Sequence, residues 1–528
     1  MNTRLRVATT ATALALAAGM FATPPAGADV LTDRAQAVTL LETGGPTLSD
    51  RAAKALLGSA DDLREFVATG QIRAREVDER VLALQAMSAG GPVVKRAAQK
   101  ALDGTPDDIR KFLATGLELA RQSDDRIRVG QAMSAGGVAV NRDAQKALDG
   151  SVEDVRAFLT TGLAKAKAED DQVTATQLMS AGGTMVKNAA KAALGGTAED
   201  VRYFLAIGNK VAADADRETA AVAQKALVAR NKFKSVALPA ANAAAKIASD
   251  ARAADKVRLD AQMDKATQDA RAANQAEADA AARVKYDADQ AAKAKESKDQ
   301  QLAEALAPGT DQAVALTDGR KVAIYFVKNA GTAVKAAAAA ALRGADDAVP
   351  GFVRTGLPTA QETDDRAAVG AIANGDGKPG LRQAAKDALA GPYAGVVEFL
   401  RTKNYPGRVH DDRIAVGQLM SVGGNVLNRE AQKALEGTPA DVRTFLESTQ
   451  YWARGIDNRI VVGQAMSAGG PEVNAVAQAV LDGPDSGLAP ALQGPLAKAK
   501  KRDEVMAAHV ATVNGVVAQA ARSAASAK

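Results

Sequence analysis

Apolar residues recur along the chain at helical spacing within short segments. In the segment VAVNRDAQKALDG they share one helical face, at i, i+4, i+7 and i+8: Val140, Ala144, Ala147 and Leu148. Ser151 and Asp154 follow at the spacing of a capping box, which predicts the start of another helix. Neither sustained alternation of apolar and polar residues nor long β-branched runs interrupt this pattern. The pattern therefore predicts an all-α protein.

The helical pattern repeats with a period of about 46 residues. A phenylalanine marks the register at seven positions: Phe66, Phe112, Phe158, Phe204, Phe352, Phe399 and Phe445. A Gly-Gly pair keeps the same rhythm at six: 44–45, 90–91, 136–137, 182–183, 423–424 and 469–470. Fixed periods of roughly 20–50 residues indicate a solenoid or array, because one small unit cannot bury its apolar face alone.

Each copy is predicted to hold three helices. In the copy that starts at Asp124, the Gly pair at 136–137 ends the first helix, Gly150 ends the second and Gly162 ends the third. The prediction for the fold is a right-handed-type α-solenoid of about eight 46-residue three-helix repeats. One phenylalanine per repeat is expected to be the largest core residue of each layer, so Phe158 should be buried and Tyr203 exposed.

A long insert interrupts the array between the fourth and fifth copies. Residues 209–317 are rich in Ala, Lys, Arg, Asp, Gln and Glu, and no glycine occurs from 209 to 308, which is typical of long helices. Two geometries fit: a helical hairpin that turns near its middle, or one coiled-coil-like rod from Ala240 to Ala307. Its apolar stripe is mostly alanine, so we expect a solvated arm whose removal leaves the repeats folded.

The boundaries divide the chain into five parts: a signal peptide (1–28), four repeats (29–208), the insert (209–317), four repeats (318–490) and a C-terminal capping helix or tail (491–528). A positive start and a short apolar run precede Ala26 and Ala28, which satisfy the cleavage rule of signal peptidase. The mature chain is expected to begin at Asp29 and to be secreted to the extracellular medium. Its other apolar stretches are too short to span a bilayer.

Composition removes several kinds of chemistry. The 528 residues include no cysteine and two histidines, His410 and His509, which argues against thiolate catalysis, zinc sites and His-based triads. The net charge of +5 is spread along the chain and aromatic residues make up 3%, which argues against nucleic-acid binding. We expect no enzymatic activity, no metal and no cofactor, and we expect neither histidine to sit in a constellation with a nucleophile or metal ligands.

Three copies carry a recognisable motif: AQKALDGTPDDIRKFLATG (98–116), AQKALDGSVEDVRAFLTTG (144–162) and AQKALEGTPADVRTFLES (431–448). They resemble the ALF repeats of secreted actinobacterial proteins, over roughly 31–208 and 318–490. The resemblance implies short helical repeats of unknown function, with signal transduction suggested and some members in exported toxin-like proteins. It brings no catalytic residues. Irregular packing is expected where the fifth copy loses its capping Asp at Pro350 and the last copy has Ala491 near the place of Phe.

Eight residues form the candidate partner surface: Asp124, Asp125, Arg126, Asp411, Asp412, Arg413, Tyr451 and Trp452. The two charged triplets recur at one register, which predicts either a ladder that docks a partner or a solvated helix face. The aromatic pair includes the one tryptophan of the chain, and these residue types are enriched at interface hot spots. A local adjustment of packing is the alternative for this pair.

Two segments resemble catalytic motifs. Ser88, like Ser134, stands in a run similar to a nucleophile turn, but no strand precedes it, so we interpret it as the end of a helix. The run from Gly375 to Gly380 matches G-x-G-x-x-G, but it replaces a Gly-Gly turn between helices and is interpreted as a widened loop.

The sequence thus predicts a secreted, non-enzymatic scaffold that binds another protein or a cell-surface component, with extracellular signalling as one setting. The alternative is an exported toxin-related or hydrolase factor with an atypical site. A third interpretation is a structural spacer of the cell envelope. The partner and the oligomeric state are not encoded in any motif of the chain.

Overall fold

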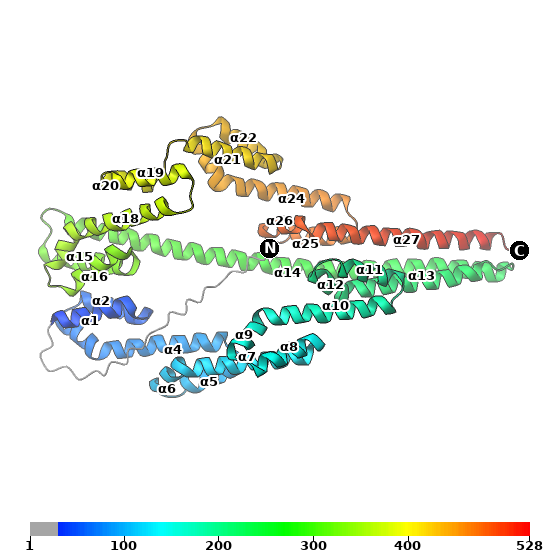
Figure 1. Ribbon diagram of the computed structural model, residues 1–528, viewed down its shortest axis with the longest axis horizontal. Helices are drawn as coiled ribbons and strands as arrows, with labels where there is room; N and C mark the ends of the chain where they lie inside the picture. Colours follow the sequence, from blue (N-terminus) through cyan, green and yellow to red (C-terminus); the bar gives the residue numbers. More distant parts are fainter. Residues whose placement is uncertain (1–29) are drawn as a thin grey trace. The chain divides into compact units, whose positions relative to one another are not determined.

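The computed structural model describes residues 30–528, and every regular element in this range is a helix (Figure 1). The predicted all-α class is therefore confirmed, while the predicted signal peptide and Asp29 lie outside the described residues. The chain forms two compact units. The first holds the described residues up to Leu117 with Ala281–Ser421 and Lys433–Glu447, and the second holds Glu118–Ala280, Val422–Gln432 and Ser448–Lys528.

Each copy contributes a long, a middle and a short helix, in this order. The long helices are α1 (Val30–Thr43), α4 (Gln71–Ala89), α7 (Leu117–Ala135), α10 (Leu163–Ala181), α13 (Asn209–Ala229), α15 (Gln312–Asn329), α18 (Leu357–Asn374), α21 (Arg408–Val422), α24 (Gln450–Ala468) and α27 (Pro495–Ala525). The middle helices are α2 (Pro46–Leu57), α5 (Pro92–Leu102), α8 (Val138–Asp149), α11 (Thr184–Leu194), α16 (Thr332–Arg343), α19 (Pro379–Ala390), α22 (Asn425–Glu436) and α25 (Pro471–Leu481). The short helices are α3 (Ala60–Glu65), α6 (Pro106–Lys111), α9 (Val152–Ala157), α12 (Ala198–Tyr203), α17 (Ala348–Gly351), α20 (Tyr393–Thr402), α23 (Pro439–Thr444) and α26 (Leu488–Gln493).

Most short helices run without a break into the next long helix. The connection is one π-helical turn in six copies: η1 (Phe66–Gly70), η2 (Phe112–Gly116), η3 (Phe158–Gly162), η4 (Phe204–Gly208), η5 (Phe352–Gly356) and η6 (Phe445–Thr449). Gly162 keeps helical angles, φ −62° and ψ −45°, so the prediction that it ends a helix is wrong. A Cβ there would lie 3.1 Å from the Phe158 ring, so the glycine makes room for that ring. In these copies the short helix, the π turn and the next long helix thus form one continuous, bent helix, so the three predicted helices are not all separate.

The Gly-Gly pairs end the long helices as predicted. Glycine is needed at both positions because a side chain there would collide with neighbouring residues. Gly137 is extended, with φ −88° and ψ −158°. A Cβ on Gly136 would lie 2.3 Å from Cγ1 of Val140, and a Cβ on Gly137 would lie 2.5 Å from the carboxyl carbon of Asp170. The first glycine makes room for a valine of the middle helix, and the second makes room for a carboxylate of the following copy.

A capping aspartate on the long helix binds the start of the middle helix one copy earlier. The carboxylate of Asp457 accepts hydrogen bonds from the backbone N–H groups of Val426 and Leu427, both at 2.9 Å. The first N–H groups of a helix have no partner within the helix, and the helix dipole favours a negative charge there. Six capping aspartates bind donors 30 and 31 residues earlier: Asp78, Asp170, Asp216, Asp364, Asp457 and Asp503.

The local predictions for helix starts and for the core are confirmed. Asp154 N–H donates to Ser151 Oγ at 3.2 Å, and Ser151 N–H donates to the Asp154 carboxylate at 2.8 Å, which completes the capping box. Phe158 is 5% exposed and packs with Val140 and Ala144. In the fifth copy, where the capping Asp is lost, α17 has 4 residues and no side-chain cap.

The insert turns near its start rather than at its middle. α13 continues from η4 as a long helix with its own capping aspartate, Asp216, and residues 230–233 lead into α14 (Lys234–Leu306). α14 is one helix of 73 residues, so it includes nearly all of the predicted rod, and the predicted hairpin with a central turn is wrong.

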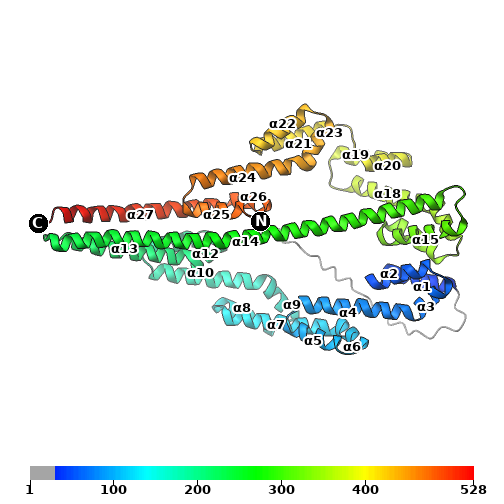
Figure 2. The same cartoon turned by 180° about the vertical axis from the view of Figure 1, so that it is seen from behind.

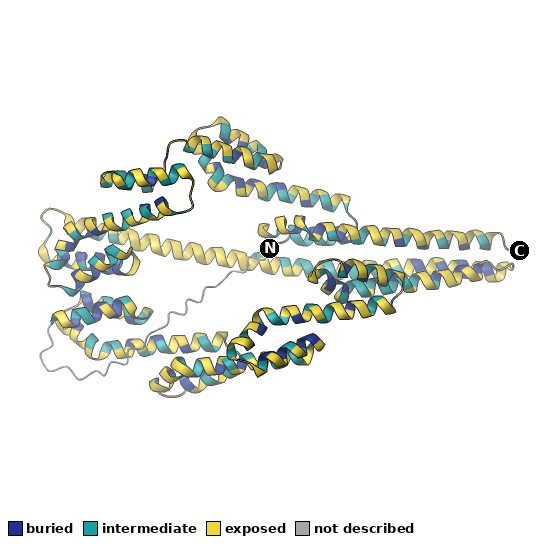
Figure 3. Cartoon of the chain, viewed as in Figure 1, coloured by how far each residue is buried: buried dark blue, intermediate teal, exposed yellow. Residues whose placement is uncertain are grey.

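The first part of α14 belongs to the core of the second unit. Ala244 is 0% exposed and packs with Val222 of α13 and Val513 of α27. α13 and α27 lie side by side in both views (Figures 1 and 2). The expectation of a solvated arm is wrong here, because alanine lets the three helices approach closely. It is right for 275–297, where every residue is exposed (Figure 3).

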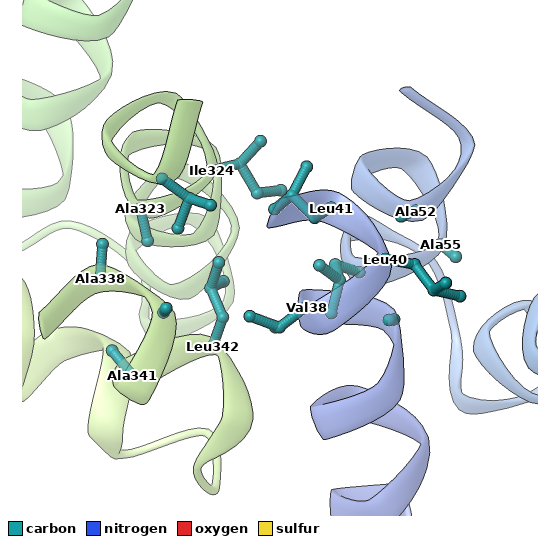
Figure 4. Packing of buried hydrophobic residues seen from close by; sticks show 14 of the residues in the cluster. Val38, Leu40, Leu41, Ala52, Ala55, Ala323, Ile324, Ala338, Ala341 and Leu342 are labelled. Carbon is teal, nitrogen blue, oxygen red and sulfur yellow. The ribbon is translucent and has the colours of Figure 1, made fainter. Parts of the chain in front are cut away.

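In the first unit, the first copy shares its core with the fifth copy. Val38 and Leu41 of α1 meet Ile324 of α15 and Leu342 of α16 (Figure 4). At the edge of this core, Arg34 donates to the carbonyl of Gly344 at 2.9 Å. Copies that are far apart in the sequence are therefore neighbours, which the linear order of repeats does not predict.

Removal of a capping aspartate is expected to destabilise the protein. Asp457→Ala leaves two backbone N–H groups without a partner, which should lower the free energy of unfolding by about 1–3 kcal/mol. Gly424→Ala should also destabilise, because its Cβ would lie 2.4 Å from the Asp457 carboxyl carbon. Chemical denaturation followed by circular dichroism measures both, with Asn458→Ala as the control on the same helix. An equal loss in the control would contradict the assignment.

Acid is expected to destabilise the repeats through their carboxylates. Burial of Asp170 favours a higher pKa, but three backbone N–H donors outweigh it and lower the pKa. Burial of Asp200 is likewise outweighed, by Lys498 and Thr197, which lower its pKa to about 2. A lowered pKa stabilises the fold above the ordinary value of about 3.9, and this stabilisation is lost as the pH falls through the lowered value. The free energy of unfolding should therefore fall between about pH 4 and pH 2; a flat pH profile in this window would contradict the prediction.

A charge placed in α14 tests which part of the insert is core. Ala244→Glu buries a carboxylate among apolar side chains and should cost about 3 kcal/mol or more. Ala278→Glu, on the exposed stretch of the same helix, should change the free energy of unfolding by less than about 0.5 kcal/mol. Thermal and chemical denaturation compare the two. Equal effects would show that α14 is a free arm along its whole length.

Candidate functional site

The first charged triplet is largely used inside its own unit. Asp124 on α7 is 6% exposed, and Asp125 pairs with Arg128 at 3.2 Å. Arg126 donates from Nη2 to the carbonyl of Leu148, near the end of α8, at 2.9 Å. The same contact to a leucine carbonyl 22 or 23 residues later recurs in three more copies, at Arg366, Arg413 and Arg459. A cation is favourable at the C-terminal end of a helix, so the arginine braces the repeat.

The second triplet makes other contacts. Asp411 accepts a hydrogen bond from the Tyr405 hydroxyl at 2.8 Å, and Asp412 lies 3.4 Å from Nε of Arg408. Both carboxylates thus have partners within their own copy. The two triplets belong to different units, and a role of either in docking remains a prediction.

Tyr451 and Trp452 are open to solvent at the start of α24. Tyr451 is 65% exposed and Trp452 is 56% exposed, which disfavours the alternative that they adjust local packing. Trp452, Ile456 and Ile460 follow one another at intervals of four residues, so they share one side of the helix. Ile460 is itself 45% exposed, and the aromatic residue therefore extends an apolar stripe.

An uncharged face recurs on the long helices, and the sequence reasoning missed it. We call it the repeated face, and on α7 it consists of Ile127, Gly130, Gln131 and Ser134, at i, i+3, i+4 and i+7. Its counterparts are Ile414, Gly417, Gln418 and Ser421 on α21, and Ile460, Gly463, Gln464 and Ser467 on α24. The three isoleucines are 41%, 46% and 45% exposed. α4 and α10 present exposed valines at the same register: Val81 and Val173.

The glycines of the repeated face have no packing role in the chain. They lie inside helices, where glycine costs about 0.5–1 kcal/mol relative to alanine. Gly370 of α18 stands at the same register, although Ala367 replaces the isoleucine there. A Cβ added at any of the four glycines meets nothing within 4 Å: Gly130, Gly370, Gly417 and Gly463. The Gly-Gly pairs, in contrast, leave no room for a side chain. The sequence does carry a signal that could have revealed the repeated face: a glycine recurs inside a predicted helix at the period of the repeat.

The serines in the runs that resemble a nucleophile turn lie in helices, which agrees with the interpretation of these runs as helix ends. Ser134 donates from Oγ to the carbonyl of Gly130 at 3.0 Å, and Ser467 donates to the carbonyl of Gly463 at 2.9 Å. Both lie in the last turn of a long helix. The glycine-rich run is a loop between α18 and α19, which confirms that interpretation.

A buried ionic cluster in the second unit joins segments that are far apart in sequence. Glu472 on α25 is 8% exposed, accepts a hydrogen bond from Nε of Arg502 on α27 at 3.1 Å, and lies 3.4 Å from Nη1 of Arg258 on α14. The Tyr203 hydroxyl donates to the same carboxylate at 3.4 Å, and its ring lies 4.3 Å from the Arg502 guanidinium carbon. Burial raises the pKa of Tyr203, so the hydroxyl stays protonated. The expectation that Tyr203 is exposed is wrong, because residues of the last copy cover it.

His509 forms a buried pair with a single carboxylate of another helix, which does not contradict the prediction for this histidine. Its Nε2 lies 2.8 Å from a carboxylate oxygen of Glu218, with side chains that are 4% and 9% exposed. The pair links α27 to α13. His410, on α21, is exposed as expected.

Neither a metal cluster nor a membrane span emerges from the described residues. From 30 to 528, no group of three or more His, Cys, Asp or Glu side chains is placed to hold a metal ion. Over the same residues, no helix combines the length and the apolar character needed to cross a bilayer.

Comparison with known proteins finds one family. A family model described as "ALF: Short repeats of unknown function" matches six segments: 34–74, 80–120, 126–166, 173–212, 327–360 and 413–453. Curated protein sequences give no match to this chain.

The six matched segments are the six copies that hold a π turn. The two unmatched copies are those whose short helix, α20 or α26, stops before the next long helix. The bent helix with its phenylalanine is thus present in every matched segment, and this chain carries six copies of the ALF repeat.

Proposed function

We propose that this protein is a secreted, non-enzymatic helical-repeat scaffold whose repeated faces bind another protein or a cell-surface component, with a role in extracellular signalling. In this proposal successive copies stack as a right-handed-type α-solenoid, which presents one repeated face per copy. An elongated partner then contacts several faces at once, and linked weak contacts give a higher overall affinity than each contact alone.

The observation that carries the proposal is the set of helix-interior glycines at open surface. Each weakens its own helix and meets nothing in its own chain, yet the feature recurs in four copies: Gly130, Gly370, Gly417 and Gly463. A glycine allows another backbone to approach closely. The exposed isoleucine one turn away offers apolar contact beside it, as on α21 and α24. Trp452 widens the apolar area on α24.

The remaining parts of the proposal rest on the sequence. Export rests on the positive start, the short apolar run and the small residues Ala26 and Ala28. The non-enzymatic character rests on the absence of cysteine and on the two histidines, of which His509 is enclosed with Glu218. Signalling rests on the family resemblance alone.

Alanine in place of three glycines is expected to strengthen the fold and weaken binding. Gly130→Ala, Gly417→Ala and Gly463→Ala together should raise the free energy of unfolding by about 0.5–1 kcal/mol per site, because alanine is the better helix former. The added methyl groups should reduce partner capture at least about tenfold if each costs about half a kcal/mol of contact. Quantitative affinity capture from the native culture and cell surface, with chemical denaturation in parallel, measures both.

Gly515→Ala is the matched control, because this glycine also lies inside a helix and meets nothing within 4 Å but is not part of a repeated face. It should stabilise α27 without change in capture. A second variant carries Ile127→Asp, Ile414→Asp and Ile460→Asp. It should abolish capture of the partner and leave the fold intact. Unchanged capture by both variants would contradict the proposal.

A further inference from the structure

One copy connects its short and long helices in a different way from the others. In six copies a π turn keeps the connection helical, and in the last copy a single residue, Gly494, separates α26 from α27. In the copy of α18, α19 and α20, five residues (403–407) separate α20 from α21. Lys403 and Gly407 bracket this segment with positive φ angles of 45° and 88°.

The sequence of this segment explains why the helix stops. Lys403 stands at the register of Gly162, the last residue of η3, where a Cβ comes close to the phenylalanine ring. Pro406 then removes a backbone N–H and disfavours helical angles at the residue before it. The segment has the same length as the helical connection in other copies, so the difference lies in conformation alone.

Tyr405 is the one buried residue of the segment. It is 8% exposed, while Lys403, Asn404, Pro406 and Gly407 are exposed. Its ring packs against the first turn of α19, where a Cβ on Gly380 would lie 2.8 Å from the ring. Its hydroxyl donates to Asp411 of α21 at 2.8 Å. Tyr405 therefore touches α21, which follows the segment, and α19 of the preceding copy.

Asp411 stands at the register of a capping aspartate but does not bind the middle helix directly. Capping aspartates accept two backbone N–H groups, as Asp364 does from Ala333 and Val334. Asp411 instead accepts the Tyr405 hydroxyl and lies 3.7 Å from Nζ of Lys378. Among the hydrogen bonds of the described residues, none joins the backbone of α19 to this carboxylate. The rigid link between copies is replaced here by an intervening side chain.

We propose that residues 403–407 are a hinge within the first unit, at which α21 pivots against α18–α20, and that Tyr405 is the clasp that holds it closed. Rotation at Lys403 and Gly407 redirects α21 without loss of any hydrogen bond inside a helix. Opening breaks the hydroxyl–carboxylate bond, the hydrogen bond from the Arg408 guanidinium to the Thr402 carbonyl and the Lys378–Asp411 contact, and it exposes one ring. These are side-chain contacts, which can open without unfolding a helix. Burial, together with the bond to Asp411, raises the pKa of Tyr405 to about 12, so the hydroxyl remains a donor at neutral pH.

Spin-label distances in the full chain test the hinge. The chain has no cysteine of its own, so spin labels attach at the two introduced cysteines and at no other cysteine. Val397→Cys on α20 with Gln418→Cys on α21 spans the hinge. Arg64→Cys on α3 with Gln85→Cys on α4 is the matched control at the same register across the π turn η1. Pulsed electron paramagnetic resonance should give a broad or two-peaked distance distribution for the first pair and a narrow one for the control. Equal widths would overturn the hinge.

Two variants test the clasp and the cause of the break. Tyr405→Phe should raise the hydrogen-exchange rates of the first turn of α21 about tenfold, as expected for the loss of roughly one hydrogen bond to a carboxylate. Lys403→Gly with Pro406→Ala and Gly407→Ala should restore a continuous helix and narrow the label distribution to that of the control. Exchange that is unchanged in Tyr405→Phe would overturn the clasp, and a distribution that stays broad in the triple variant would overturn the assigned cause of the hinge.

Discussion

The contact on which the architecture depends is the bond between a carboxylate of a long helix and the free N–H groups of the preceding middle helix. It fixes the register between neighbouring copies and explains the second glycine of each Gly-Gly pair, whose Cβ would occupy the place of the carboxylate. Six of the middle helices are therefore completed by the long helix that follows in the next copy. α13 and α27, which are followed by no ordinary middle helix, still supply this contact through Asp216 and Asp503.

The segments that end the arrays are joined by contacts of two kinds. Alanines of α13, α14 and α27 allow close packing with little apolar area. Polar pairs beside them add specificity: Glu472 with Arg258 and Arg502, and Glu218 with His509. Buried ion pairs contribute little net stability relative to apolar packing, but they penalise any arrangement that leaves a charge unpaired. The ionic cluster is thus best understood as a device that selects one arrangement of these helices.

Glycine serves three distinct purposes in this chain, and they differ in what an added methyl group would meet. At Gly137 and Gly424 a carboxylate fills the space, at Gly162 a phenylalanine ring does, and at Gly417 nothing does. The first two kinds hold the repeat together. The third kind weakens a helix for no internal gain, and for this reason it supports the proposed partner surface. The π turns keep the connection helical in six copies, whereas Pro406 and Lys403 interrupt the helix at one position, where the protein is proposed to bend.

The sequence by itself determined the features that depend on residues a few positions apart: the helices, the 46-residue period, the capping boxes, the buried phenylalanines and the loop at 375–378. Glycine adopts helical and extended angles with similar ease, so sequence alone could not decide that Gly162 continues a helix while Gly137 ends one. Of the candidate surface, the sequence singled out Tyr451 and Trp452 but left open whether they face solvent. It predicted neither the burial of Asp124 nor the open space at Gly417. The tertiary structure alone decided the pairing of the first and fifth copies, the partial burial of Tyr203 and the burial of His509. Their partners lie more than 200 residues away in the chain, and no local pattern encodes which distant helix covers a given face.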